Sequence, residues 1–189
     1  MFLYLIDYLG SISSSFYVFE YITLRAILSI ITALVISLLI GPILIKKFSL
    51  VNISEVIRSD GPESHQKKSG TPTMGGLLII FSLLVSTLIW SDLNNKYVLY
   101  LIFASVSFAI IGLVDDYRKL KKDKKGISAK TKIFLQIISA GTLAIVMYNF
   151  LESPQEQQLI IPFFKDVIID LGIFFIPFVT LVIISTSNA

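Results

Sequence analysis

Five apolar runs, each roughly long enough to cross a membrane, follow one another along this chain with short polar links between them. They span residues 22–45, 73–90, 97–114, 132–150 and 170–185. The hydrocarbon core of a bilayer takes about 20 apolar residues per helix, so the third and fifth runs are on the short side. One such run also fits a buried helix of a soluble protein, but five in series argue against a soluble fold. The sequence therefore predicts an all-α polytopic integral membrane protein, with residues 1–189 in a single transmembrane domain.

Composition narrows the chemistry that such a chain can carry. Apolar residues make up 54% of the chain and charged residues 15%, and there is no cysteine. Disulfides and thiolate metal sites are therefore excluded. The start of the chain lacks the basic end and short apolar run of a cleavable signal peptide.

Basic residues predict the orientation in the membrane. Residues 46–71 carry five lysines and arginines and residues 115–132 carry eight, out of sixteen in the chain. Basic loops stay on the cytoplasmic side, so we expect cytoplasmic loops at 46–72 and 115–131 and an amino terminus outside. Trp90 and Tyr97 flank the short outer turn, as aromatic anchors at a membrane interface do.

Two adjacent acids, Asp115 and Asp116, stand where the third apolar run ends and a basic loop begins. Acids at a helix C-terminus are disfavoured by the helix dipole, so a purely structural role needs a compensating partner. Paired carboxylates beside lysines also suit Mg²⁺ binding or proton transfer on a phosphate substrate. Lys119 lies four residues after Asp115, which allows both side chains to face one site. We therefore predict that Asp115 and Asp116 are catalytic and that Lys119 contacts substrate.

Weaker signals leave their alternatives open. The glycines at the start of the second span can serve tight helix packing or an anion at the helix N-terminus. Ser128 looks like the N-cap of the fourth span, and residues 159–161 favour a small hairpin. His65, the single histidine, is expected to be a solvated loop residue.

Four stretches carry a resemblance to a known family: HQKKSGTPTMGG at 65–76, GLVDDYRK at 112–119, KKGISAKTK at 124–132 and STSNA at 185–189. In these stretches the chain resembles the phospho-N-acetylmuramoyl-pentapeptide transferases. The first stretch is highly specific. Related polyprenyl-phosphate sugar-1-phosphate transferases share the acidic pair and the double glycine, but they differ before the glycines.

The resemblance implies an activity and a location. Such enzymes transfer phospho-MurNAc-pentapeptide from UDP-MurNAc-pentapeptide to undecaprenyl phosphate, forming lipid I and UMP, and they require Mg²⁺. The reaction belongs to peptidoglycan synthesis and so to cell wall biogenesis, cell shape and cell division. The family fold has ten membrane helices in the bacterial cytoplasmic (inner) membrane, with the active site facing the cytoplasm. Membrane lipids are further expected partners, a homodimer is one assembly to test, and nucleic acid is not expected.

The resemblance also assigns residues. Asp115 and Asp116 match the acidic pair of the family, and five further residues match positions that line its active site: Lys68, Thr73, Lys119, Lys130 and Asn188. A later Mg²⁺-binding aspartate would lie beyond Ala189. We therefore expect the chain to hold five of the ten helices, as the amino-terminal half of the enzyme.

Mechanism and function keep alternatives at this stage. An aspartate can remove the proton of the acceptor phosphate or form a covalent aspartyl intermediate. A related UDP-N-acetylhexosamine-1-phosphate transferase is a second function, although the residues before Gly75 argue against it. A non-catalytic membrane scaffold is a third, and it predicts that asparagine can replace both acids without effect.

Overall fold

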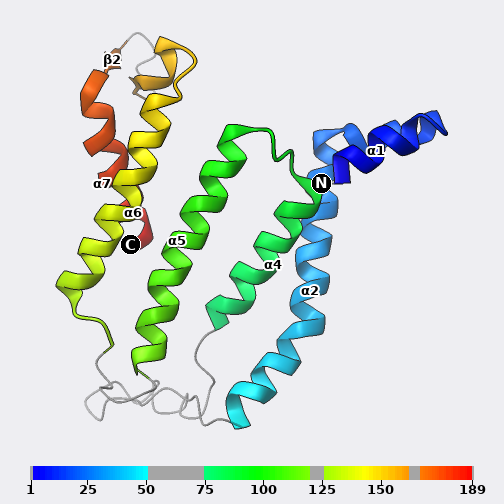
Figure 1. Ribbon diagram of the computed structural model, residues 1–189, viewed down its shortest axis with the longest axis horizontal. Coiled ribbons are helices and arrows are strands. Elements are labelled where there is room, and N and C mark those ends of the chain that lie inside the picture. Colours follow the sequence, from blue (N-terminus) through cyan, green and yellow to red (C-terminus); the bar gives the residue numbers. More distant parts are fainter. Residues whose placement is uncertain (1, 51–74, 120–125, 162–166, 189) are drawn as a thin grey trace. The chain divides into compact units, whose positions relative to one another are not determined.

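A computed structural model of the protein describes residues 2–50, 75–119, 126–161 and 167–188 (Figure 1). Within these ranges the chain forms two compact units, Met1–Gly126 and Ile127–Ala189, and each is described here by itself. Both consist mainly of helices, which satisfy their own backbone hydrogen bonds and so suit a lipid environment.

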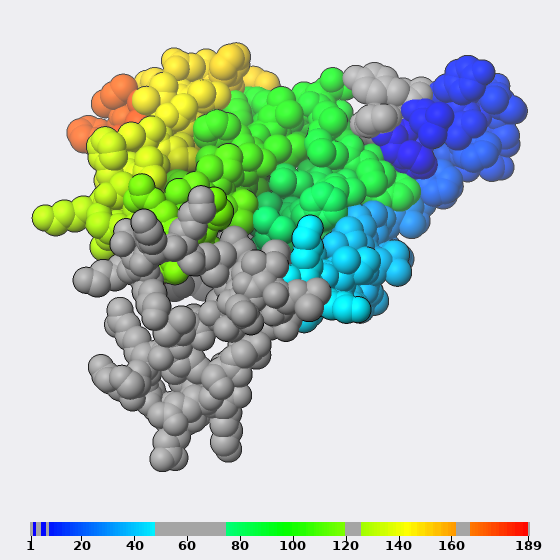
Figure 2. All heavy atoms as spheres, turned by 60° about the horizontal axis from the view of Figure 1, so that its bottom comes forward, coloured from blue at the N-terminus to red at the C-terminus, as the bar shows by residue number. Residues whose placement is uncertain are grey.

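The first unit is built on three long helices. It contains α1 (Phe2–Gly10), a 3-10 helix (Ser14–Glu20), α2 (Ile22–Leu50), α4 (Gly75–Trp90) and α5 (Lys96–Arg118). Helix α2 packs along α4, and α4 contacts α5 (Figures 1 and 2). At Gly41 a Cβ atom would lie 3.3 Å from Cδ2 of Leu78, so glycine allows α2 to approach α4 closely. Helix α2 ends, α4 begins and α5 ends at the same end of this unit (Figure 1).

At the other end of this unit, Trp90 joins the end of α4 to α2. Its indole Nε1 donates a hydrogen bond to Oγ1 of Thr32, 2.9 Å away, and its carbonyl oxygen accepts one from Arg25 at 3.5 Å. The ring of Phe2 packs edge-on against the indole, with 4.6 Å between ring centroids. We call this group of residues the Trp90 clasp. It ties α1, α2 and α4 together at one level.

Small polar side chains are buried within the first unit, while large apolar ones face outwards. Ser82 and Ser86 of α4 are buried, and each hydroxyl donates to a carbonyl oxygen three residues earlier in its own helix. Leucines on α2 and α5, among them Leu38 and Leu101, are about two-thirds exposed. Small polar residues at helix contacts and large apolar residues on the outer surface are typical of membrane helices.

The second unit is a pair of helices joined by a hairpin. It contains α6 (Ala129–Asn149), a 3-10 helix (Pro154–Gln157), strands β1 (Gln158–Ile160) and β2 (Ile168–Asp170), a 3-10 turn (Gly172–Phe174) and α7 (Phe175–Asn188). Helices α6 and α7 pack against each other, and the antiparallel strands pair Leu159 with Ile169. The hydroxyl of Ser128 accepts a hydrogen bond from the Thr131 N–H, which confirms the predicted N-cap. The predicted hairpin is also present.

The predicted fold class is confirmed. Three helices in the described part of the chain are long and apolar enough to cross a membrane: Ile22–Lys47, Lys96–Arg118 and Ala129–Asn149. Two shorter apolar helices, Gly75–Trp90 and Gly172–Asn188, correspond to the second and fifth runs. The prediction that the third run is short was wrong, because its helix includes residues on both sides of the apolar run and is 23 residues long. The last helix begins later than residue 170, because Asp170 ends β2 and its carboxylate accepts a hydrogen bond from the Gly172 N–H.

Candidate functional site

The two adjacent acids lie inside the last turn of α5. The apolar run ends at Val114, and the helix continues to Arg118. Lys119 caps it, since its backbone N–H donates to the carbonyl oxygens of Asp115 and Asp116. The basic side chains of Arg118 and Lys119 at this end of α5 offset the unfavourable interaction of the two acids with the helix dipole. Both carboxylates therefore stand on regular helical backbone, with the compensating partner that such positions require.

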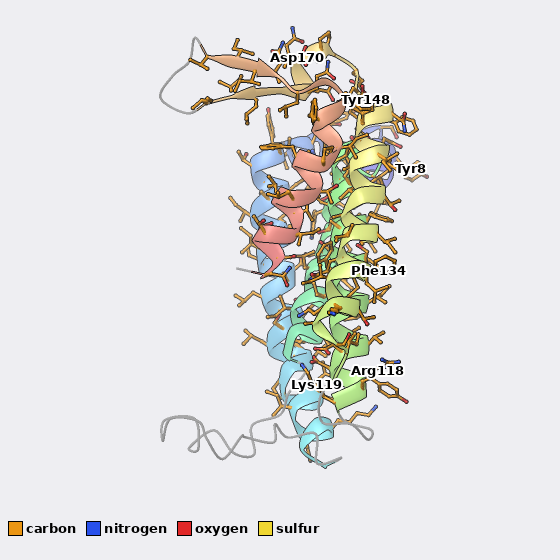
Figure 3. All side chains as sticks on the ribbon, turned by 90° about the vertical axis from the view of Figure 1, so that its left-hand side faces the viewer. Tyr8, Arg118, Lys119, Phe134, Tyr148 and Asp170 are labelled. Carbon is orange, nitrogen blue, oxygen red and sulfur yellow. The ribbon has the colours of Figure 1, made fainter. Side chains whose placement is uncertain are left out.

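Asp115, Asp116 and Lys119 form a charged group that we call the acid–lysine cluster. Nζ of Lys119 lies 2.7 Å from Oδ2 of Asp115 and 3.7 Å from Oδ1 of Asp116. The prediction that Lys119 and Asp115 face one site is therefore confirmed. Figure 3 shows Arg118 and Lys119 at the opposite end of the first unit from Tyr8. A hydrogen bond to Asp115 raises the pKa of Lys119 above 10.5, against the opposing effect of partial burial, and the charges of both acids add to the rise.

The two carboxylates differ in their access to solvent. The side chain of Asp115 is 12% exposed and is held by Lys119, whereas that of Asp116 is 38% exposed and lies farther from the ammonium group. Neighbouring residues on a helix diverge by about 100°, so one backbone segment presents the two acids in different directions. Asp115 is thus the acid that fixes Lys119, and Asp116 is the acid that is more accessible to solvent.

Asp116 also lines a cavity of about 360 Å³ between α4 and α5. The rest of its lining is apolar and comes from Gly76, Leu77, Ile80, Phe81 and Leu84 of α4 and from Ala109, Gly112 and Leu113 of α5. A Cβ atom at Gly76 or Gly112 would meet nothing within 4 Å, so both glycines leave the cavity open. The cavity combines apolar walls with one carboxylate, which suits a ligand that is apolar along its length and polar at one end.

Two further predicted residues belong to the second unit. Lys130 is exposed in the first turn of α6, and Asn188 is at the end of α7. The amide of Asn188 pairs with that of Gln136 through two hydrogen bonds, one in each direction, of 3.0 and 3.3 Å. Gln136 is only 3% exposed, so α6 holds the Asn188 side chain from a buried position. Lys68 and Thr73 lie outside the described residues.

The sequence did not lead us to predict Gln136 as the partner of Asn188, or Gly126 as a neighbour of the acid–lysine cluster. Gln136 carried a signal, because a polar residue within an apolar helix is a functional candidate by default. Gly126 carried a weaker one, as a glycine in a basic loop. Its backbone has φ +70°, and it lies against Asp115 and Lys119.

The cluster offers oxygen ligands to a metal ion. Within the described ranges, no group of three histidine, cysteine, aspartate or glutamate residues is placed to hold a metal. Mg²⁺, however, usually keeps several waters and binds through one or two carboxylates together with substrate phosphates. The exposed carboxylate of Asp116 fits such a role, since hard oxygen donors suit Mg²⁺.

Sequence comparison adds two matches to this geometry. Residues 98–189 match the family model of glycosyl transferase family 4, and residues 68–80 match signature 1 of phospho-N-acetylmuramoyl-pentapeptide-transferase. The predicted resemblance to these transferases is confirmed. The first match includes the acid–lysine cluster, Lys130 and Asn188, and the second includes Lys68 and Thr73. Together the matches support a phosphosugar transferase activity.

Proposed function

We propose that this protein transfers phospho-MurNAc-pentapeptide from UDP-MurNAc-pentapeptide to undecaprenyl phosphate, in peptidoglycan synthesis at the bacterial cytoplasmic membrane. The acceptor phosphate attacks the phosphorus that carries the sugar, the bond between that phosphorus and UMP breaks, and lipid I and UMP are formed. The match at residues 68–80 supports the identity of the sugar, because that signature is the one of phospho-N-acetylmuramoyl-pentapeptide-transferase. The two basic loops predicted from the sequence support an active site that faces the cytoplasm.

The acid–lysine cluster is the observation that carries the proposal. It places two carboxylates at the end of a membrane helix, within 3.7 Å of one lysine ammonium group. Phosphoryl transfer depends on charge neutralisation and in-line positioning of its two phosphates. The raised pKa of Lys119 keeps its ammonium group charged throughout the neutral range, where it neutralises the diphosphate of the donor. Asp116, the more exposed acid, faces the reacting phosphates.

The apolar cavity supports a lipid acceptor. Its walls come from membrane helices, and Asp116 is the charged residue in its lining. A polyprenyl phosphate likewise has an apolar chain and a single polar group, the phosphate, at one end. Its chain would lie between α4 and α5, with the phosphate near Asp116 and Lys119. Mg²⁺, when bound at Asp116, would neutralise phosphate charge and bring donor and acceptor together.

The test measures UMP release from the full-length polypeptide that carries this sequence, in detergent with Mg²⁺ and undecaprenyl phosphate. Asp116→Asn should lower turnover at least about 10²-fold if this carboxylate serves as base or orients the metal. Asp115→Asn should lower it too, because the substitution releases Lys119. Asp92→Asn is the control, since this acid accepts a local hydrogen bond from the Asn94 N–H in the turn between α4 and α5. Near-normal turnover of both cluster variants would refute the proposal and leave the scaffold alternative.

A donor competition separates the proposal from its nearest relative. UDP-N-acetylhexosamine, offered in place of UDP-MurNAc-pentapeptide, should release no UMP above background. Efficient turnover with that donor would assign the chain to the related hexosamine-1-phosphate transferases instead.

A further inference from the structure

Gly126 lies directly against the ion pair of Asp115 and Lys119. Its φ angle of +70° is in the left-handed region, which residues other than glycine and asparagine rarely adopt. A Cβ atom built on it would meet Oδ1 of Asp115, and it would lie 2.9 Å from Cε and 3.1 Å from Cγ of Lys119. Real Cβ atoms essentially never approach other atoms under 3.0 Å. A residue with a side chain at this position therefore requires the flexible ends of the Asp115 and Lys119 side chains to shift.

Most other glycines of the described chain are not confined in this way. Gly172 also has a positive φ, of +46°, but its Cβ would meet nothing within 4 Å. Gly75 likewise has open space around it. Gly126 combines the unusual backbone angle with contact to two charged side chains that face each other. The position thus constrains the ion pair itself and not only the turn.

We propose that Gly126 is a positioning residue for the acid–lysine cluster. Its bare α-carbon lets the backbone at residue 126 lie against the Asp115–Lys119 pair, and the close packing sets the direction of the lysine ammonium group. This inference rests on the proposed function, because the consequence for turnover depends on the role of Lys119. The contact between Gly126 and Lys119 is independent of that role and can be tested separately.

The first test measures the contact. Lys119 would be labelled with a limiting amount of an amine reagent in the full-length protein, and its modification rate followed by mass spectrometry of peptides. In the parent, the ion pair keeps the amine protonated and slow to react. In Gly126→Ala the pair is displaced, and Lys119 should react several-fold faster, approaching the rate of the exposed Lys130. An unchanged rate at Lys119 would overturn the inference, whatever happens to activity.

The second test measures turnover. Misplacing a catalytic group by about 1 Å can cost about 10²-fold in rate, so Gly126→Ala should lower turnover by about 10- to 100-fold. Gly172→Ala is the matched control for backbone strain and should stay within about twofold, because its φ is positive but its surroundings are open. Gly126→Asn tolerates the backbone angle but still carries a Cβ atom. It should therefore be as impaired as Gly126→Ala, and recovery of activity in Gly126→Asn would overturn the steric argument.

A double substitution separates positioning from a general structural role. If Gly126 acts through Lys119, then Gly126→Ala should have little further effect on turnover in a Lys119→Gln background. Fully additive losses would refute the positioning role. The outcomes also separate this inference from the proposed function. Normal turnover of Lys119→Gln itself, together with faster labelling of Lys119 in Gly126→Ala, would overturn the catalytic role of the cluster while leaving the contact in place.

Discussion

The amide pair of Gln136 and Asn188 should make a measurable contribution to the stability of the second unit. We consider the change Gln136→Leu, which removes both hydrogen bonds of the amide pair between α6 and α7 and puts an apolar side chain in place of the amide. Asn188 keeps its 2.8 Å bond to the carbonyl oxygen of Ile184, so the loss is confined to the contact between the helices. Hydrogen bonds between membrane helices contribute about 0.6 kcal/mol on average and up to about 1.7 kcal/mol. Two of them predict a loss of about 1–2 kcal/mol, which corresponds to about a 5- to 30-fold change in the unfolding equilibrium.

A double-mutant cycle isolates this contribution. Gln136→Leu, Asn188→Leu and the double variant would be unfolded in mixed micelles with increasing denaturing detergent, with helix content followed by circular dichroism. The interaction energy from the cycle should be about 1–2 kcal/mol, because the two amides bond to each other across the interface. Thr142→Val is the control on the same helix. Its hydroxyl donates to its own helix at Ile138, so the change should cost less than about 0.5 kcal/mol. An interaction energy near zero would refute the reasoning.

Three further predictions address orientation, pH and packing. The chain has no cysteine, so single cysteines introduced at Lys96 and Lys122 can be probed with an impermeant thiol reagent. The cysteine at position 96 should be labelled from outside and the one at 122 should not, and the reverse pattern would invert the predicted topology. Because the pKa of Lys119 is raised above 10.5, its ion pair stabilises the protein fully below that pH and is lost as pH rises through the raised value. Lys119→Gln should therefore unfold more readily than the parent at about pH 8, with a difference that shrinks above pH 10.5; a constant difference would contradict the pairing. Gly41→Leu should destabilise the first unit by about 1–3 kcal/mol in thermal unfolding, since its Cβ meets Leu78 at 3.3 Å, and a neutral result would show that α2 and α4 can separate there.

The sequence predicted those features that depend on local pattern. Apolar runs predicted the helices, because burial in lipid requires long apolar segments whatever their neighbours are. The contact between Lys119 and Asp115 followed from their spacing of four residues on one helix. Helix α5 continues to Arg118, beyond the end of the apolar run, and Lys119 pairs with both acids at the end of the helix.

The remaining features depend on contacts between distant segments. Gln136 and Asn188 are 52 residues apart, and neither the α6–α7 pairing nor its register follows from apolar periodicity. The cavity between α4 and α5 depends on which residues of the two helices line it, among them Gly76 and Gly112. The closeness of Gly126 to the ion pair does not follow from its spacing in the sequence. The catalytic roles of Asp115 and Asp116 remain predictions, as do the substrate-binding roles of five residues: Lys68, Thr73, Lys119, Lys130 and Asn188.

The Trp90 clasp fixes one end of the helix pair α2 and α4. It ties α2 to α4 at one end by a side-chain hydrogen bond and by the packing of Phe2. At the other end α4 starts with Gly75 and Gly76, where an added methyl group would meet nothing within 4 Å. The close approach of Gly41 to Leu78 also lies near that end, so α2 and α4 are held together at both ends. We therefore expect these two helices to move as one body, and an acceptor chain that enters the cavity between α4 and α5 to displace α5 instead.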